Sequence, residues 1–230
     1  MNLQCSNITY RYPRGEAEIF NALGCGLSGP GFHGLFGPSG VGKSTLARIM
    51  AGEISSYGGE MTGTERISIL YSANTERLPG WSSVGAHLRK VIPRERLPLL
   101  TEIVEAFDLT SCLDARFSQL SLGQKNRANL TRYLLQDFDL LIMDESLANV
   151  DESTREQIIM TIKAMFPEKC FLYISHSVAE VAKFCQRILV LRDPAKAPQV
   201  VEVGGQDHFP QREMEQAALE RTMLEIVHAA

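Results

Sequence analysis

Hydrophobic positions in the first part of the chain come in short stretches separated by turn residues. Residues 2–12 and 19–27 are rich in apolar and β-branched side chains, and Pro13, Gly15 and Gly24 interrupt them. Short stretches of this kind, broken by proline and glycine, are typical of antiparallel strands joined by turns. The pattern therefore predicts a small antiparallel β lobe at the start of the chain.

A second pattern begins with the compact apolar run at residues 32–36. A glycine-rich loop follows this run, and after it Leu46, Ile49 and Met50 recur at helical spacing. A change from a continuous apolar run to a period of three to four residues indicates a strand that leads through the loop into a helix.

The middle and the second half of the chain differ in their periodicity. Residues 84–135 carry helical spacing and few strand signals, with breaks at Pro93 and Pro98, which predicts an inserted helical segment. Beyond it, apolar strands alternate with amphipathic helices, a pattern typical of a mostly parallel sheet flanked by helices. The expected strands are 140–143, 170–174 and 187–191, and the expected helices are 153–165 and 178–184.

The tail of the chain, residues 211–228, predicts one more helix. Leu219, Met223, Ile226 and Val227 would share one face of it. That face either packs on its own domain or contacts a second chain, and the pattern leaves both open.

Composition limits the classes of function. The 230 residues are 44% hydrophobic, enough for one large α/β domain, and no apolar run approaches the roughly 20 residues that a membrane-spanning helix needs. The N-terminus lacks the pattern of a signal peptide, so we expect a cytoplasmic protein. A net charge of −4 offers no broad basic surface for nucleic acid. The five cysteines have no metal-site spacing, and we expect them to be buried hydrophobic side chains.

Candidate chemistry starts with the glycine-rich loop, Gly37-Pro-Ser-Gly-Val-Gly-Lys43-Ser44, which matches the G-x-x-x-x-G-K-[ST] pattern. Glycines let successive backbone N–H groups turn toward phosphate oxygens, and the helix that follows adds its positive N-terminal end. Lys43 would reach the β- and γ-phosphates of ATP, and Ser44 would bind Mg²⁺. The predicted nucleotide-binding residues here are Gly37, Pro38, Ser39, Gly40, Val41, Gly42, Lys43, Ser44 and Thr45.

Two carboxylates end the apolar strand that follows the helical segment, at Asp144 and Glu145. Phosphoryl transfer needs acids opposite the phosphate loop, one for the metal ion and one for the attacking water. Asp144 is therefore the expected Mg²⁺ residue, and Glu145 the expected general base. On its own such a pair could equally be the exposed end of a surface strand.

Taken together with these two motifs, Leu120-Ser121-Leu122-Gly123-Gln124 resembles the LSGGQ signature of the ABC (ATP-binding cassette) ATPase family, with the expected order and spacing. The resemblance covers nearly the whole chain. It implies that Ser121, Gly123 and Gln124 contact the γ-phosphate bound by a second subunit, so that two ATP molecules lie between the subunits of a head-to-tail dimer.

Three shorter matches keep the family's order along the chain. Tyr12 resembles the aromatic residue that stacks on adenine, whereas Tyr10 is expected to face the sheet. Asp151 resembles the aspartate that crosses the dimer interface, and His176 resembles the switch histidine that reads the γ-phosphate. A histidine at a strand end is otherwise most often structural.

The chain also departs from the family pattern. After the aromatic Tyr71, where the family places a metal-coordinating and coupling glutamine, stands Ser72, so Ser72, Asn74 or a water would have to substitute. Leu122 replaces a signature glycine. The surface near residues 72–88, with Trp81, Val84 and Leu88, is by resemblance the docking site for a membrane partner, although Trp81 could equally be ordinary packing.

The resemblance implies an α/β P-loop ATPase of ABC type, with a mostly parallel core sheet, an N-terminal antiparallel β lobe and an inserted α-helical lobe. The expected parts are a nucleotide-binding core with its β lobe (1–75 and 135–210), a helical lobe (76–134) and a C-terminal helix (211–230).

Such a protein would bind ATP and Mg²⁺, hydrolyse ATP and energise solute transport on the inner face of the cell membrane. Its expected partners are membrane-spanning subunits, a second ATPase subunit and an extracytoplasmic solute-binding protein, but no nucleic acid. The chain's ending is similar to that of importer ATPases for nitrate, sulfonate or taurine. The alternative function is an ATP-dependent dimerisation switch or regulatory subunit with weak hydrolysis. Cargo and transport direction stay open.

Overall fold

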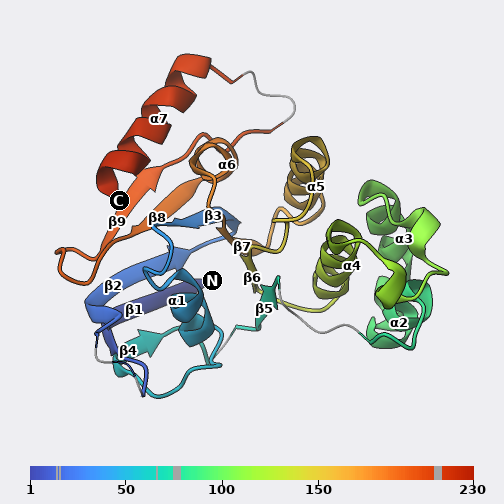
Figure 1. Ribbon diagram of the computed structural model, residues 1–230, viewed down its shortest axis with the longest axis horizontal. Coiled ribbons are helices and arrows are strands. Elements are labelled where there is room, and N and C mark those ends of the chain that lie inside the picture. The colour runs from blue at the N-terminus through green and yellow to red at the C-terminus, as the bar shows by residue number, and fades with distance from the viewer. Residues whose placement is uncertain (14, 16, 66, 75–78, 210–213) are drawn as a thin grey trace.

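Two separate β-sheets organise the chain (Figure 1). The computed structural model describes residues 1–13, 15, 17–65, 67–74, 79–209 and 214–230. The expected boundaries of the helical lobe at 75/76 and of the C-terminal helix at 210/211 touch segments outside these residues, so the division into lobes stays a prediction.

The smaller sheet forms the predicted antiparallel β lobe. It has the strand order β2-β1-β4, with β1 at Asn2–Tyr10, β2 at Phe20–Ser28 and β4 at Gly58–Thr62. Leu3, Cys5 and Ile8 of β1 point inward and are buried. The sequence pattern predicted β1 and β2, whereas β4, which carries two glycines and no fully buried residue, was not predicted.

The larger sheet has the order β5-β6-β7-β3-β8-β9 and is parallel except for its last strand. This confirms the predicted mostly parallel core. Its strands are β3 (Gly31–Phe36), β5 (Ile69–Ala73), β6 (Leu140–Asp144), β7 (Cys170–Ile174), β8 (Arg187–Leu191) and β9 (Val200–Gly204).

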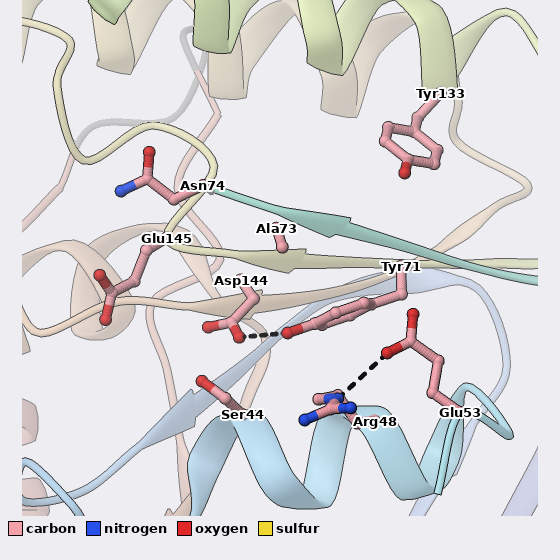
Figure 2. A pocket seen from close by; sticks show the side chains of 9 residues that line it. All are labelled: Ser44, Arg48, Glu53, Tyr71, Ala73, Asn74, Tyr133, Asp144 and Glu145. Atoms are coloured by element: carbon pink, nitrogen blue, oxygen red, sulfur yellow. Dashed lines mark hydrogen bonds and ion pairs between the residues drawn. The ribbon is translucent and has the colours of Figure 1, made fainter. Parts of the chain in front are cut away.

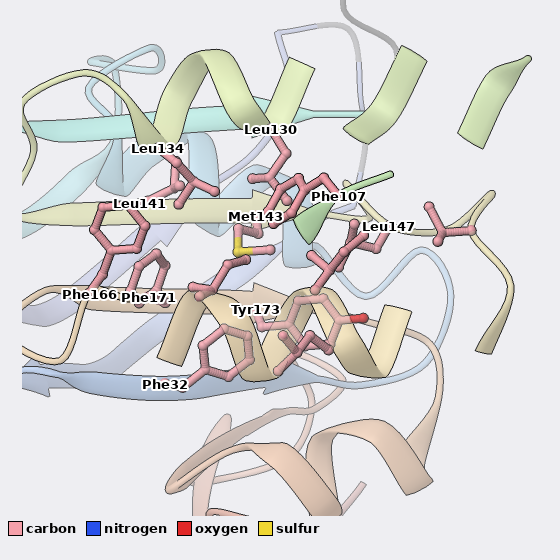
Figure 3. Packing of buried hydrophobic residues seen from close by; sticks show 14 of the residues in the cluster. Phe32, Phe107, Leu130, Leu134, Leu141, Met143, Leu147, Phe166, Phe171 and Tyr173 are labelled. Atoms are coloured by element: carbon pink, nitrogen blue, oxygen red, sulfur yellow. The ribbon is translucent and has the colours of Figure 1, made fainter. Parts of the chain in front are cut away.

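Both faces of this sheet are covered, which explains the continuous apolar runs of its central strands. Alternate residues of β6 enter two different hydrophobic clusters. Leu141 and Met143 pack beneath the helices with Phe171 and Tyr173 of β7 (Figure 3), whereas Leu140 packs against the β lobe and α1. Side chains from every part of the chain therefore fix the position of the strand that ends in Asp144.

Helices cover the sheet and extend to one side of it (Figure 1). The segment between β5 and β6 is helical as predicted, and its α2, α3 and α4 lie together away from the β lobe. The helices are α1 (Lys43–Met50), α2 (Val84–Val91), α3 (Leu97–Ala106), α4 (Leu122–Leu134), α5 (Glu152–Met165), α6 (Val178–Phe184) and α7 (Gln216–Ala229), with short 3₁₀ turns at Arg94–Arg96, Thr110–Cys112 and Phe117–Gln119.

The C-terminal helix α7 packs on α6 and β9, which gives the tail an intramolecular partner. Its buried face differs in part from the predicted one. Leu219 and Ile226 are buried as expected, but Thr222 is buried beside them and Val227 is 55% exposed. The prediction was wrong at Val227, because this residue follows Ile226 directly and therefore points away from the face of α7 that Leu219, Thr222 and Ile226 bury.

All five cysteines are buried and free, as predicted. Among the residues that the structure describes, none of the helices is long and apolar enough to cross a membrane.

Candidate functional site

The glycine-rich loop leaves the end of β3 and enters α1, and its geometry requires glycine at two positions. Gly42 has a φ of 109°, and a Cβ atom there would lie 2.6 Å from Ile19 Cγ2. A Cβ atom on Gly37 would lie 2.3 Å from the carbonyl oxygen of Leu191. A side chain at either position would therefore push the loop off the sheet.

Lys43 begins α1 and is buried. Its ammonium donates hydrogen bonds to the carbonyl oxygens of Gly37 at 2.8 Å and Pro38 at 3.0 Å, so it lies across the loop. Burial lowers the pKa of Lys43, and the carboxylates of Glu145 and Asp144 act in the opposite direction. The loop therefore holds one desolvated cation beside two anions.

A cavity of about 600 Å³ opens beside this lysine (Figure 2). Ser44 projects into it from α1, facing Asp144 at the end of β6. Tyr71 of β5 donates a hydrogen bond from its hydroxyl to Asp144 Oδ2 at 2.7 Å. Burial raises the pKa of Tyr71, and the bond to Asp144 adds to the effect, so the phenol stays a donor.

Glu145 follows Asp144 at the point where the chain turns sharply away from the sheet. Its φ is 51°, a conformation that few residues other than glycine adopt. Glu145 Oε1 pairs with Nε2 of His176, which follows the neighbouring strand β7. The two predicted catalytic residues thus lie together at the carboxyl edge of the parallel sheet, where such sheets place their sites.

Tyr12 reaches the same region from the β lobe. Its hydroxyl is 2.7 Å from Thr45 Oγ1, and its ring packs edge-on against Tyr10 with centroids 5.2 Å apart. Tyr12 as a whole is 41% exposed. Tyr10 also packs against Phe20 of the sheet, as expected.

The signature residues lie away from the phosphate loop, at the start of α4 on the helical segment. Ser121 Oγ accepts from the backbone of Gln124 at 3.2 Å, and Gln124 Oε1 accepts from the backbone of Ser121 at 2.9 Å. A Cβ atom on Gly123 would lie 2.5 Å from the carbonyl oxygen of Asn149. The signature therefore contacts the loop that leads to Asp151.

Asp151 caps α5, and its Oδ1 accepts from the backbone N–H of Thr154 at 3.0 Å. This hydrogen bond lowers the pKa of Asp151. The side chain is exposed, and its predicted contact with a second chain stays a prediction.

The structure corrects the reading of Ser72. Ser72 is fully buried, and its hydroxyl and carbonyl oxygens both accept from Ser146 Oγ, at 3.0 and 2.9 Å. Asn74 lines the cavity instead, with its Oδ1 accepting from Asn126 at 2.9 Å and Asn149 at 3.2 Å. Ser72 faces away from the cavity because alternate residues of a strand face opposite sides and its neighbours Tyr71 and Ala73 line the cavity, whereas Asn74 reaches the cavity from just beyond the end of β5.

The expected partner surface also needs correction. Trp81 is 84% exposed, whereas Val84 and Leu88 are fully buried in the helical segment. Only Trp81 of the three is available to a partner.

Four further side chains that line the cavity were not predicted, because they belong to none of the sequence motifs and come from separate elements. Tyr71 comes from β5, Arg48 and Glu53 from α1 and the turn after it, and Tyr133 from the far end of α4. Arg48 Nε and Glu53 Oε2 form an exposed ion pair at 3.1 Å. The alternation of β5, which places Tyr71 on the same side as Ala73, was the one available signal.

The residues present fit a nucleotide with a hard divalent ion. The loop leaves no room for side chains at Gly37 and Gly42, and hydroxyl and carboxylate oxygens from Ser44 and Asp144 face one another. Oxygen donors of this kind suit Mg²⁺, which keeps several ligands from water and phosphate. No group of three or more metal-binding side chains occurs in the described part of the chain.

These features define a P-loop nucleotide-binding protein, and comparisons with known proteins identify its family. The sequence profile of the ABC transporter family matches residues 29–148, more than half of the chain. The chain belongs to this family, among the ATP-binding subunits of ABC transporters.

Relatives and solved structures agree with this assignment. An uncharacterized ABC transporter ATP-binding protein of Haemophilus influenzae is 33% identical over 169 residues, covering 70% of each chain. The thiamine import ATP-binding protein ThiQ of Yersinia pestis is 31% identical over 175 residues, covering 68% of this chain and 74% of ThiQ. A bacterial Atm1-family ABC exporter with ATP bound matches 99% of this chain and 41% of its own, with a TM-score of 0.77 at 20% identity, which shows the fold.

Proposed function

We propose that this chain binds and hydrolyses Mg-ATP and thereby energises solute transport through a separate membrane-spanning partner. The observation that carries the proposal is the pairing of Glu145 with His176 beside the cavity that Ser44 and Asp144 line. Phosphoryl transfer needs a general base, a group that holds this base in place, and oxygen donors for a metal ion. Residues of these kinds lie together at one edge of the sheet.

Each residue has a separate role in this proposal. The backbone N–H groups of the loop and the Lys43 ammonium would bind the phosphates, and Ser44 and Asp144 would hold Mg²⁺, which would neutralise phosphate charge. Tyr71 fixes the orientation of Asp144 through its hydrogen bond. Glu145 accepts a proton from the attacking water, while His176 keeps the carboxylate directed along the sheet edge.

The exposed positions of Ser121 and Asp151, and the half-buried position of Gln124, support a head-to-tail dimer in which these residues complete the site of a second chain. Tyr12 would stack on adenine. ATP would close the dimer and hydrolysis would reopen it, a shift between two populations driven by the ligand. The exposed Trp81 marks the surface that would dock a membrane-spanning subunit on the inner face of the membrane.

The names of relatives differ in cargo and direction: thiamine import for ThiQ, nickel import for NikE and Nod factor export for another. An extracytoplasmic solute-binding protein would belong only to an importer. The similarity of the tail to nitrate, sulfonate or taurine importer ATPases stays a prediction.

Turnover of Mg-ATP by the purified chain, with Glu145→Gln as the matched variant, tests the proposal. We expect turnover that falls by about a thousandfold in Glu145→Gln, because the general base is lost while the phosphate loop is intact. Light scattering should then show an ATP-dependent dimer of Glu145→Gln, since bound ATP is no longer consumed.

The alternative, a dimerisation switch with weak hydrolysis, has one observation in its favour. Asn74, which lines the cavity at the end of β5, is shorter than glutamine and its side-chain oxygen is already bonded to Asn126 and Asn149. An ATP-dependent dimer without turnover in the unsubstituted chain would establish this alternative and contradict the proposed ATPase.

A further inference from the structure

Glu180 of α6 joins a buried polar network beneath the sheet edge. Its Oε2 accepts hydrogen bonds from Tyr173 Oη and from Ser175 Oγ, both at 2.7 Å. Its Oε1 pairs with Nη1 of Arg155, which comes from α5. The side chains of Arg155 and Glu180 are only 20% and 12% exposed, so this is a largely desolvated ion pair.

Arg155 extends the network to the loop that carries Asp151. Its Nη2 donates to the carbonyl oxygen of Val150 at 2.6 Å, and its backbone N–H donates to the carbonyl oxygen of Asp151 at 2.9 Å. The guanidinium therefore binds Glu180 with one nitrogen and the loop with another, and the single ammonium nitrogen of a lysine does not reproduce the fixed spacing of these two donors.

Ser175 extends the network in the other direction, to the loop that carries His176. Its hydroxyl donates to Glu180 and also accepts from the backbone N–H of Ser177 at 3.1 Å. These two bonds hold the backbone on both sides of His176. A continuous hydrogen-bonded chain thus runs from the carbonyl before Asp151 through Arg155 and Glu180 to the residue before His176.

We propose that Arg155 and Glu180 are positioning residues that couple the Asp151 loop to the His176 loop. Contact between Asp151 and a second copy of this chain would then set the position of His176, and through it the carboxylate of Glu145, within the same chain. The inference rests on the proposed ATPase function. It adds a path by which dimer closure is communicated to the catalytic base.

The chain contains a matched control for this path. Lys183 and Glu156 form an ion pair at 2.7 Å that links the same two helices, α6 and α5. The hydrogen bonds described for these side chains reach neither loop. A variant that loses this second ion pair shows how much the attachment of α5 to α6 alone contributes to turnover.

The experiment compares Arg155→Lys, Ser175→Ala and Lys183→Met with the unsubstituted chain. Arg155→Lys keeps the charge opposite Glu180 but loses the simultaneous bond to Val150, and Ser175→Ala removes one hydroxyl without stranding a charge. We expect each of these two variants to lower kcat about tenfold and to make the dependence of turnover on ATP concentration less cooperative. Binding of a fluorescent ATP analogue to the single chain should stay within about twofold, because the phosphate loop is untouched.

Lys183→Met should leave kcat and cooperativity unchanged. Equal losses of turnover in Lys183→Met and Arg155→Lys would overturn the proposal, and so would a parallel loss of nucleotide affinity, because either result indicates a general structural role.

Amide hydrogen exchange separates this inference from the proposed function. The measurement uses the chain without nucleotide. Ser175→Ala should accelerate amide exchange in residues 146–151, which lie on a different segment from Ser175. Lys183→Met should leave the exchange of these residues unchanged. No turnover in the unsubstituted chain, with this exchange response present, would contradict the ATPase and support the coupling. Turnover with no exchange response would contradict the coupling alone.

Discussion

His33 lies in β3, the strand that leads into the phosphate loop, and neither of its ring nitrogens has a hydrogen-bond partner among the described residues. Burial lowers the pKa of His33 to about 4 from an ordinary value of 6.5, and the nearby charge of Arg187 adds to this effect. The folded state therefore keeps this histidine neutral at pH values where the unfolded chain already binds a proton.

The stability of the fold should fall as the pH falls from 6.5 toward 4. In this window the unfolded chain binds more protons at His33 than the folded chain does, which lowers the free energy of unfolding by up to about 3 kcal/mol. His33→Leu should remove this part of the pH dependence, measured by urea unfolding at several pH values. The exposed His228→Gln is the control, and an unchanged slope in His33→Leu would contradict the assignment.

Single residues were predictable from the sequence where a motif specifies both residue type and spacing. Lys43, Asp144, Glu145 and His176 belong to motifs, and the structure brings them to one edge of the sheet. Asn74 could not be distinguished from Ser72, because two residues that lie two positions apart share one face of a strand, and the sequence does not show that β5 ends at Ala73, before Asn74. The end of the strand is set by where its pairing with β6 stops, at Ala73 opposite Asp144, which is a tertiary property.

At the scale of elements, Lys163 joins α5 to the end of α6 and to the segment after β9. Its buried ammonium donates to the carbonyl oxygens of Phe184 at 3.0 Å and His208 at 2.8 Å, and it pairs with Asp207 at 2.7 Å. Burial lowers the pKa of Lys163, and the bond to Asp207 opposes this effect. One cation thus satisfies acceptors from two other segments.

Lys163→Met should destabilise the fold by about 3 kcal/mol, because it leaves a carboxylate and two carbonyl groups without their buried donor. Chemical denaturation followed by circular dichroism measures this change. Lys169→Met removes a lysine that pairs with the exposed Asp137 at 3.7 Å and should cost less than about 1 kcal/mol. Similar losses for the two variants would show that Lys163 is not essential to this junction.

Elements with a continuous apolar run or a helical period were predictable, whereas strands that form only through pairing with a neighbouring strand were not. The strands β6, β7 and β8 are buried apolar runs, and the helices α5 and α6 match their predicted ranges within one residue. β9 lies at the sheet edge with only Val200 and Val203 buried, so its sequence carries little signal. It pairs with β8 in antiparallel register, which local sequence cannot specify.

At the scale of the whole molecule, the two halves of the proposed site lie on different parts of the surface. Ser44, directly after Lys43, lines the cavity, whereas Ser121 lies at the start of α4 and is exposed. A closed cyclic dimer would bring each half to the other half of a second chain. A single chain should therefore bind nucleotide but hydrolyse it poorly.

Mixing two inactive variants tests this arrangement. Lys43→Ala and Ser121→Arg should each be inactive alone, because every site of either dimer then lacks one half. A mixture forms dimers in which one composite site is intact, and up to about a quarter of the original turnover should return, since half of the dimers are mixed and each has one of two sites. Absence of recovery, with mixed dimers verified by mass, would contradict a site shared between chains.

The burial of all five cysteines has a practical consequence for following such a dimer. Thiol-reactive dyes need an accessible sulfur, so the folded chain offers them no native target. Trp81→Cys would then introduce one readily labelled position on the exposed surface of the helical segment without removal of the native cysteines. A fluorophore at this position would allow the separation between two copies to be recorded in real time as ATP is added and consumed.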